Sequence, residues 1–322
     1  MKNKLILQKK RSSKLMLIVN SNMTTTDKLS VLVKTYGKFI GLIPLYLILI
    51  ALSAVFIIPF VYMIGHSLMS VSDIMNLNIK WIPRSFNFNN YIFAFSRLNY
   101  IHYLLWTLLI VGLCVFGQVL SCSFVAYGLS RIKFKLNGLI FALVVFLLIV
   151  PPQTIIVPSL IMYTRFFHWD NTFLPIIVPC FFALGLNGGL MVFVFRQFFK
   201  SLPAELENAA LIDGTGFIGA YFRVIFPNAK PAILITSILS LVWQWNNYFE
   251  PSVYIKDISN GSLTMQLQGF NSSLAGVVQT GVDLNQALNL AATFLTILPV
   301  LIIFFIIQRQ FMASIASSGL AN

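Results

Sequence analysis

Six long apolar segments constrain the fold of this chain more than any other feature. They lie at about 39–66, 103–129, 138–164, 173–195, 229–249 and 286–308. A helix needs about 20 apolar residues to cross the hydrocarbon core of a bilayer, and each segment is long enough. Only 10% of the residues are charged, whereas soluble domains have roughly one quarter. We therefore expect an all-α polytopic membrane protein with six transmembrane helices.

The basic residues predict the orientation of these helices. With six crossings, the N-terminal tail, the 130–137 loop, the 196–230 segment and the C-terminal tail lie on one side and hold 17 of the 22 Lys and Arg residues. Cytoplasmic loops carry the excess of Lys and Arg, so both termini should be cytoplasmic. We expect residues 1–35 to form a mobile or surface-lying basic tail, 36–312 the transmembrane domain and 313–322 a C-terminal tail.

The segment 200–228 is polar and carries helix signals of its own. Pro203 suits a first helical turn, and Glu205 places negative charge near the helix N-terminus. Gly214 can adopt the left-handed conformation that ends a helix. A second short helix should follow and stop at Pro227. One face of the first helix holds Leu206, Ala209, Ala210 and Asp213. Two short helices with a sharp turn between them predict a docking element on the membrane surface.

The motif Glu207-Asn-Ala-Ala-Leu-Ile-Asp-Gly214, followed by Arg223-Val-Ile-Phe-Pro227, resembles the EAA loop of permease subunits of ABC importers. More narrowly, it is similar to the carbohydrate-uptake branch that includes the maltose-type permeases. The resemblance extends over about residues 40–312. Supporting stretches are Trp81–Tyr91, Ser123–Arg131, Val150–Gln153 and Gln244–Phe249.

The resemblance implies a type I importer permease, located in the bacterial plasma membrane, that forms a pathway with a second permease chain. It also implies two cytoplasmic ATPase subunits, an extracytoplasmic solute-binding protein, a carbohydrate substrate of the oligosaccharide class, and contact with membrane lipid. The residues expected to couple this chain to the ATPase are Glu207, Asn208, Ala209, Ala210, Asp213, Gly214 and Pro227. The ATPase would receive the 200–228 segment in a surface cleft, so that closure of the ATPase dimer switches access to the pathway.

Two positions depart from the family pattern. The glutamate that most relatives carry five residues before the aspartate is Asn208 here, next to Glu207. This change weakens a charged contact to the expected partner. The Trp-Asn-Asp of many relatives is Trp245-Asn246-Asn247 here, which removes a charge near the membrane.

Polar residues inside the apolar segments are the candidates for the substrate path, because an intramembrane polar group is costly unless it has a partner or lines a cavity. The candidates are Gln153, Asn187, Trp243, Gln244, Asn246 and Asn247. Aromatic faces with amide side chains suit a sugar, whose hydroxyls need donors and acceptors. The same set at 243–247 also fits an interfacial aromatic belt with amides that join helices. Both interpretations stay open on the sequence alone.

A Gly-x-x-x-Gly spacing at Gly185 and Gly189 also has two interpretations. It predicts either a close-packing face between membrane helices or a bent middle of the fourth span near Asn187. Polar residues of the second span, Gln118, Ser121 and Ser123, lie in one region of that span.

Other motifs exclude classes of function. The run from Gly214 to Gly219 matches G-x-G-x-x-G, but it follows a helix and has no acid about 20 residues later, so it is not a dinucleotide site. A Walker A motif is absent, so ATP and Mg²⁺ are expected on the partner ATPase and no cofactor on this chain. The scattered His and Cys residues predict no metal site and no disulfide framework. The basic tail has no aromatic-interleaved pattern, which favours anionic lipid over nucleic acid.

Three alternatives remain at this stage. The first is an importer permease for a peptide, polyamine or anion, which the EAA loop alone does not distinguish. The second is an ion-coupled secondary transporter, which would need an intramembrane carboxylate, and no Asp or Glu lies well within any of the six segments. The third, an intramembrane enzyme, would need paired Asp residues, a Ser–His set or a metal cluster in the segments, and the sequence offers none.

Overall fold

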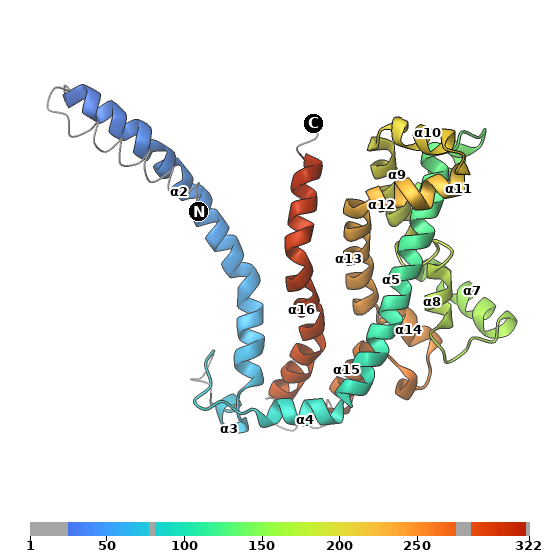
Figure 1. The fold of residues 1–322 in the computed structure, drawn as a ribbon. Coiled ribbons are helices and arrows are strands. Elements are labelled where there is room, and N and C mark those ends of the chain that lie inside the picture. The colour runs from blue at the N-terminus through green and yellow to red at the C-terminus, as the bar shows by residue number, and fades with distance from the viewer. Residues whose placement is uncertain (1–24, 77–80, 275–284, 320–322) are drawn as a thin grey trace. The chain divides into compact units, whose positions relative to one another are not determined.

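The structure is a computed structural model that describes residues 25–76, 81–274 and 285–319. Within these ranges every regular element is helical and no strand occurs. The chain divides into two compact units, Met1–Met63 and Ile64–Asn322. Three helices of the described part are long and apolar enough to cross a membrane, or four if one bent pair counts as a single span. The expectation of an all-helical membrane protein is therefore confirmed (Figure 1).

The first unit consists, in its described part, of the long helix α2, Thr25–Ser67, which continues into the second unit. The apolar side chains of its residues 42–61 are exposed, for example Phe56 at 71%. A patch of this size on one helix is stable only against lipid or another apolar surface. The helix begins at Thr25, so residues 25–35 are helical where the sequence predicted a tail. Residues 1–24 of that predicted tail lie outside the described residues.

In the second unit, α5 is the central helix and packs against α8, α9 and α13 (Figure 1). The bounds are Tyr100–Arg131 for α5, Leu174–Cys180 for α8, Gly188–Ser201 for α9 and Lys230–Asn246 for α13. The α5 helix closely matches the predicted second span. Its buried face is rich in small and polar residues, including Cys114, Gly117, Gln118 and Cys122. These small side chains allow the neighbouring helices to approach closely.

The predicted third span is not one helix. It consists of α6, α7 and short 3-10 and π segments: α6 Asn137–Phe146, η1 Pro152–Ile155, α7 Ile156–Ile161 and η2 Met162–Phe166. Pro151 and Pro152 stand at the break. Because proline lacks a backbone donor and disfavours the helical conformation of the preceding residue, the pair interrupts the helix.

The predicted fourth span is also broken, between Cys180 at the end of α8 and Gly188 at the start of α9. Ala183 and Asn187 have positive φ values of 60° and 56°. A Cβ added at Gly185 would lie 2.6 Å from the Sγ of Cys180, and one at Gly189 would lie 2.9 Å from the Val144 carbonyl oxygen on α6. Gly185 thus belongs to the bent middle of the span, and Gly189 to a close contact between helices.

Side chains of α5 satisfy the backbone groups that this break leaves unpaired. Gln118 donates from Nε2 to the Leu186 carbonyl over 2.7 Å. The Ser121 hydroxyl donates to the Cys180 carbonyl over 2.7 Å and accepts from the Ala183 N–H over 3.0 Å. In the membrane an irregular backbone is tolerated only when such partners exist. These two polar residues of the second span therefore support the fold.

The remaining helices complete the second unit. Their bounds are α3 Val71–Ile74, α4 Asn89–Arg97, α14 Phe249–Tyr254, η4 Ile258–Asn260, α15 Leu263–Leu274 and α16 Gln286–Gly319. Helix α16 packs against α4 and α13, and its junction with α13 includes a hydrogen bond from Trp245 Nε1 to the Thr296 carbonyl of 3.2 Å. It continues to Gly319, so residues 313–319 are helical and not a separate tail.

Candidate functional site

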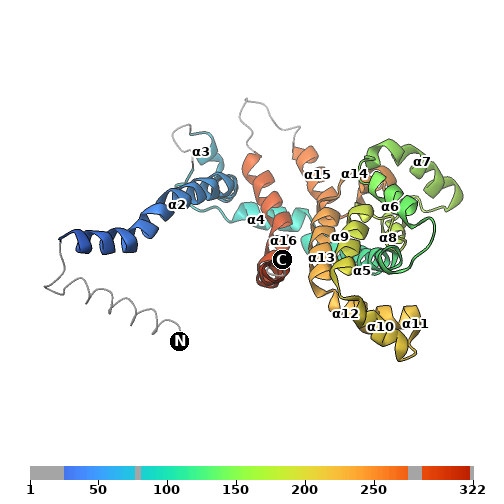
Figure 2. The same ribbon diagram turned by 90° about the horizontal axis from the view of Figure 1, so that it is seen from above.

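The segment 200–228 forms three short helices at the Arg131 end of α5 (Figure 1). In the view along α5 they extend to one side of the α5, α9 and α13 group (Figure 2). The elements are α10 Ala204–Ile212, α11 Gly216–Ala220, the π turn η3 Tyr221–Ile225 and α12 Phe226–Asn228. Helices α11 to α12 meet α13 at an angle of 78°. The segment therefore crosses the end of the bundle instead of continuing a span.

The turn after α10 follows from its sequence. Gly214 has a φ of 79°, as its role at the helix end predicts. Its N–H donates to the Leu211 carbonyl over 3.1 Å, and the Thr215 N–H donates to the Ala210 carbonyl over 3.2 Å. These two bonds form a Schellman motif, which closes a helix around a left-handed residue. The Thr215 hydroxyl adds a second bond to the same Ala210 carbonyl, of 2.7 Å.

The second helix of the segment ends beside Pro227, in agreement with the sequence. Residues 216–228 continue without a break through α11, η3 and α12, and the helix ends at Asn228, one residue after Pro227. The chain then bends at Ala229 before α13. A difference of one residue is within the usual uncertainty of a helix boundary.

The structure shows which residues of α10 turn inward. Glu207 and Ala210 are buried, at 7% and 6% exposure. Asn208, Ala209 and Asp213 are exposed, as is Gly214. Ala210 therefore packs within its own chain, and its predicted approach to a partner alongside Ala209 stays a prediction. The helical spacing of three between 207 and 210 explains why these two share the buried side.

Ile212 is the residue that the sequence analysis missed on this surface. Its side chain is 85% exposed at the last turn of α10. Large apolar side chains with so little cover, next to the exposed Asn208, Ala209 and Asp213, are typical of contact surfaces. The sequence held a signal for this exposure. Ile212 lies two residues after the inward-facing Ala210, and residues two apart on a helix do not share a face.

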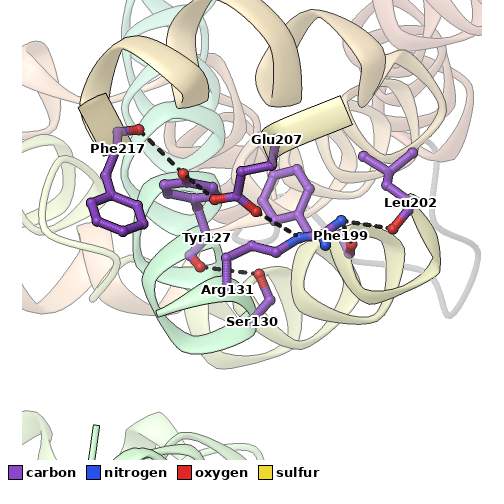
Figure 3. Close-up of polar contacts among 7 residues, drawn as sticks. All are labelled: Tyr127, Ser130, Arg131, Phe199, Leu202, Glu207 and Phe217. Atoms are coloured by element: carbon purple, nitrogen blue, oxygen red, sulfur yellow. Dashed lines mark hydrogen bonds and ion pairs between the residues drawn. The ribbon is translucent and has the colours of Figure 1, made fainter. Parts of the chain in front are cut away.

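The burial of Glu207 depends on two residues at the end of α5 (Figure 3). The Tyr127 hydroxyl donates to Glu207 Oε1 over 2.6 Å, and it also lies 3.2 Å from the Phe217 carbonyl oxygen on α11. Arg131 Nε lies 3.6 Å from Glu207 Oε2, as an ion pair with both side chains about one tenth exposed. This set, which we call the Glu207 anchor, joins α5, α10 and α11.

Arg131 also holds the end of α9. Its terminal nitrogen donates to the Phe199 carbonyl over 2.7 Å and to the Leu202 carbonyl over 2.8 Å (Figure 3). Carbonyls at a helix C-terminus have no helical partners, and a cation there is favourable. One guanidinium therefore fixes both the start of the 200–228 segment and, through Glu207, its first helix.

An aromatic cluster beneath the anchor fixes η3. Tyr221 is 1% exposed, its ring centroid lies 5.2 Å from that of Tyr127, and its hydroxyl pairs with Ser123 Oγ at 2.7 Å. Phe195, Phe199 and Ile225 are buried in the same cluster. Packed interiors of this kind transmit displacements, so α11 and α12 are rigidly connected to the membrane helices.

The predicted substrate-path residues do not converge. Gln153 and Asn187 are exposed at the two span breaks, and Trp243 is half-buried against the cluster around Tyr127. Gln244 is buried and directs Nε2 to Cys180 Sγ at 3.6 Å. None of these residues lines either of the two cavities described below. Their role in the path stays a prediction.

The two amides that follow are used within the chain. Asn246 Nδ2 donates to the Val242 carbonyl of its own helix over 2.8 Å. Asn247 Nδ2 donates to Glu250 Oε2 over 2.8 Å, and its own Oδ1 accepts from the Glu250 N–H over 3.4 Å, just before and within the first turn of α14. All of these bonds are local in the sequence, so they leave both interpretations of the 243–247 stretch open.

Glu250 itself is an acidic residue at the edge of the membrane region that the sequence analysis passed over. It is half-buried and lines a cavity of about 80 Å³ together with Ser159, Tyr163 and Tyr254. Across the described part of the chain, no group of three His, Cys, Asp or Glu residues is placed to hold a metal ion. The Glu250 cavity is therefore lined by one carboxylate with hydroxyl neighbours.

Comparison with known proteins agrees with this architecture. Residues 118–316 match the family of binding-protein-dependent transport system inner membrane components. A solved structure, a bacterial ABC transporter involved in the import of the acidic polysaccharide alginate, superposes with a TM-score of 0.69 over 90% of this chain and 99% of that chain, at 18% identity. The anchor residues Tyr127, Arg131 and Glu207 all fall within the matched range.

Curated relatives extend over most of the chain. The melibiose/raffinose/stachyose import permease protein MelC of Bacillus subtilis is 30% identical over 81% of this chain and 90% of its own length. A probable starch degradation products transport system permease protein, AmyC of Thermoanaerobacterium thermosulfurigenes, is 27% identical over 84% and 93%. The arabinooligosaccharides transport system permease protein AraQ of B. subtilis is 28% identical over 86% and 95%. The chain belongs to the family of binding-protein-dependent transport system inner membrane components, as an ABC transporter permease and a non-enzymatic subunit of the bacterial inner membrane.

Proposed function

We propose that this permease carries a neutral oligosaccharide and couples its import to cytoplasmic ATPase subunits through the exposed face of α10. The carbohydrate assignment is supported by relatives named for melibiose, raffinose and stachyose, for starch products and for arabinooligosaccharides. A second permease chain would complete the pathway, and an extracytoplasmic binding protein would deliver the sugar. Two ATPase subunits would bind below, one of them at the 200–228 segment.

The single observation that carries the coupling role is the contrast between the two faces of α10. The inward face is fixed by the Glu207 anchor, and the outward face exposes Asn208, Ala209, Ile212 and Asp213. A rigid support beneath an exposed surface can transmit force, because packed interiors deform little. Closure of an ATPase dimer against this face would act differently on the inward-facing and outward-facing states, which coupling requires.

The test is deletion of the gene in its native host and complementation with tagged variants. We expect uptake of at least one of radiolabelled raffinose, maltotriose or arabinotriose to disappear on deletion. Ile212→Glu should retain the permease in the membrane but lose both uptake and co-purification of the ATPase. Ile82→Glu, at an isoleucine that is 76% exposed and lies between the first two predicted spans, is the matched exposed apolar control for ATPase retention. Unchanged sugar uptake after deletion, with loss of uptake of a peptide, polyamine or anion, would overturn the carbohydrate assignment.

A further inference from the structure

One cavity lies far from the 200–228 segment, at the opposite end of α5. It has a volume of about 530 Å³. The 32 residues of α5 span about 48 Å at a rise of 1.5 Å per residue, so the two sites are at opposite ends of the bundle. Small-molecule sites have volumes of about 300–1,000 Å³. Besides Phe173 and two aliphatic side chains, the lining residues are His102, Trp106, Asn171, Thr172, Ser259 and Asn260.

Three segments of the chain form the cavity, and hydrogen bonds hold them together. Asn171 has a φ of 57°, its N–H donates to the Tyr254 carbonyl over 3.1 Å, and its Oδ1 accepts from the Asp257 N–H over 3.0 Å. From α5, the Tyr103 hydroxyl donates to the Ser259 carbonyl over 3.1 Å. The cavity is therefore preformed, which lowers the entropic cost of binding.

The lining combines an aromatic surface with neutral polar groups. Trp106 is 41% exposed, and its ring meets Phe173 edge-on at a centroid distance of 6.3 Å. Asn260 and Ser259 are exposed at the rim, and Asn171 is half-buried. No Lys, Arg, Asp or Glu is among the described residues that line the cavity. This composition disfavours ionic ligands, since a charged solute would find no opposite charge.

We propose that this cavity is a carbohydrate-binding site in which a neutral sugar ring stacks on Trp106 and its hydroxyls bond to Asn260, Asn171 and Ser259. The apolar face of a pyranose matches an indole, and its hydroxyls match side chains that both donate and accept. This proposal rests on the proposed function. It adds a site on this subunit that is separate from the predicted path residues at 153, 187 and 243–247. The cavity is at the end at which a sugar would enter.

The test measures sugar binding to the intact importer, purified from its native host through a tag on this chain and without the binding protein. Equilibrium binding of raffinose, maltotriose and arabinotriose is compared for the unmodified complex and for Trp106→Ala, Trp106→Phe and Asn260→Ala. Trp81→Ala is the matched control, because Trp81 is 48% exposed and does not line the cavity. Gel filtration verifies that each complex is intact.

We expect Trp106→Ala to weaken binding of the preferred sugar by about tenfold, equivalent to about 1.4 kcal/mol, because the stacking surface for the sugar ring is lost. Trp106→Phe should retain part of the affinity, Asn260→Ala should weaken it, and Trp81→Ala should not change it. Equal binding in all variants, or no binding in the unmodified complex, would overturn the proposal.

Two further outcomes separate the possible failures. If the cavity receives a loop of the binding protein, Trp106→Ala will abolish stimulation of the ATPase by the binding protein and leave sugar binding unchanged, which contradicts the proposal. If sugar uptake in the native host depends on the gene while no binding depends on Trp106, the cavity proposal is wrong and the proposed function stands. Absence of gene-dependent sugar uptake contradicts both.

Discussion

Tyr127 and Glu207 are separated by 80 residues in the sequence and are joined by a hydrogen bond of 2.6 Å. The tyrosine belongs to a membrane helix and the glutamate to the exposed α10, so the bond connects the bundle to the proposed docking element. Arg131 adds the ion pair at 3.6 Å. A movement of α10 by a partner would therefore displace the end of α5 directly.

The first prediction concerns this bond. Tyr127→Phe removes the donor and leaves a buried carboxylate oxygen without it, which should lower the stability of the complex by about 1–3 kcal/mol. Thermal unfolding of the purified importer measures the change, and ATPase retention should fall in parallel. Tyr248→Phe, at an exposed tyrosine, is the control and should leave both unchanged. Equal unfolding temperatures for the two variants would show that the anchor contributes little.

The sequence predicted the composition of this docking element but not its support. Pro203, Gly214 and the spacing of apolar residues predicted short helices, because these signals act locally. The anchor could not be predicted, because Tyr127 reaches Glu207 only through the packing of α5 against α10. The burial of Ala210 could not be predicted for the same reason. The periodic pattern identified the residues that share a face of the helix, but it did not show which face the bundle covers.

The sequence also predicted the membrane spans only in part. Hydropathy predicted α5 well, because its 32 residues form one uninterrupted helix. It placed the third and fourth spans but not the breaks within them, since hydropathy does not register a backbone conformation such as the positive φ of Ala183. That conformation depends on Ser121, whose hydroxyl binds the freed groups from another helix.

The second prediction compares two neighbouring alanines of α10. Ala209 is exposed and Ala210 is buried. Ala209→Glu should leave the permease at its normal level in the membrane and reduce ATPase co-purification, because the charge is added to the docking face. Ala210→Glu should lower the amount of permease itself, because it places a charge in a packed site. Quantitative blotting and co-purification distinguish the two, and identical behaviour would contradict the assignment of faces.

The third prediction concerns the backbone at Gly214. A Cβ there would meet no atom within 4 Å, so any cost of substitution comes from its φ of 79°. Gly214→Val should cost about 1 kcal/mol or more and reduce sugar uptake, and Gly214→Asn should be tolerated better, since asparagine adopts this conformation more readily. Gly138→Ala, also with open space but without a positive φ, is the control. Equal uptake by the valine and asparagine variants would contradict the argument.

The fourth prediction concerns two exposed residues of the EAA-like motif: Asn208, which differs from the family pattern, and Asp213, which matches it. Asn208→Glu restores the usual acidic residue on an exposed site and should maintain or improve ATPase retention. Asp213→Lys reverses a charge on the same face and should detach the ATPase without changing the amount of permease. Co-purification at low and high salt measures both effects, because exposed ion pairs weaken as salt is added. Loss of the ATPase in Asn208→Glu would show that the partner surface does not accept the family's usual charge.

The fifth prediction concerns topology. Reporter fusions at Arg131 and near Gly214 should be cytoplasmic, and fusions near Asn87 and Gly261 external, because basic residues are concentrated on the side of Arg131. The helical path agrees with this arrangement, since Arg131 and the 200–228 segment meet in the Glu207 anchor at one end of α5. An external report from the Gly214 fusion would contradict the docking role, because ATP is cytoplasmic. A related test in cells that express the permease separates an ATP-driven importer from an ion-coupled transporter. Glu250→Gln should leave sugar uptake intact in an ATP-driven importer, whereas an ion-coupled transporter would depend on this carboxylate.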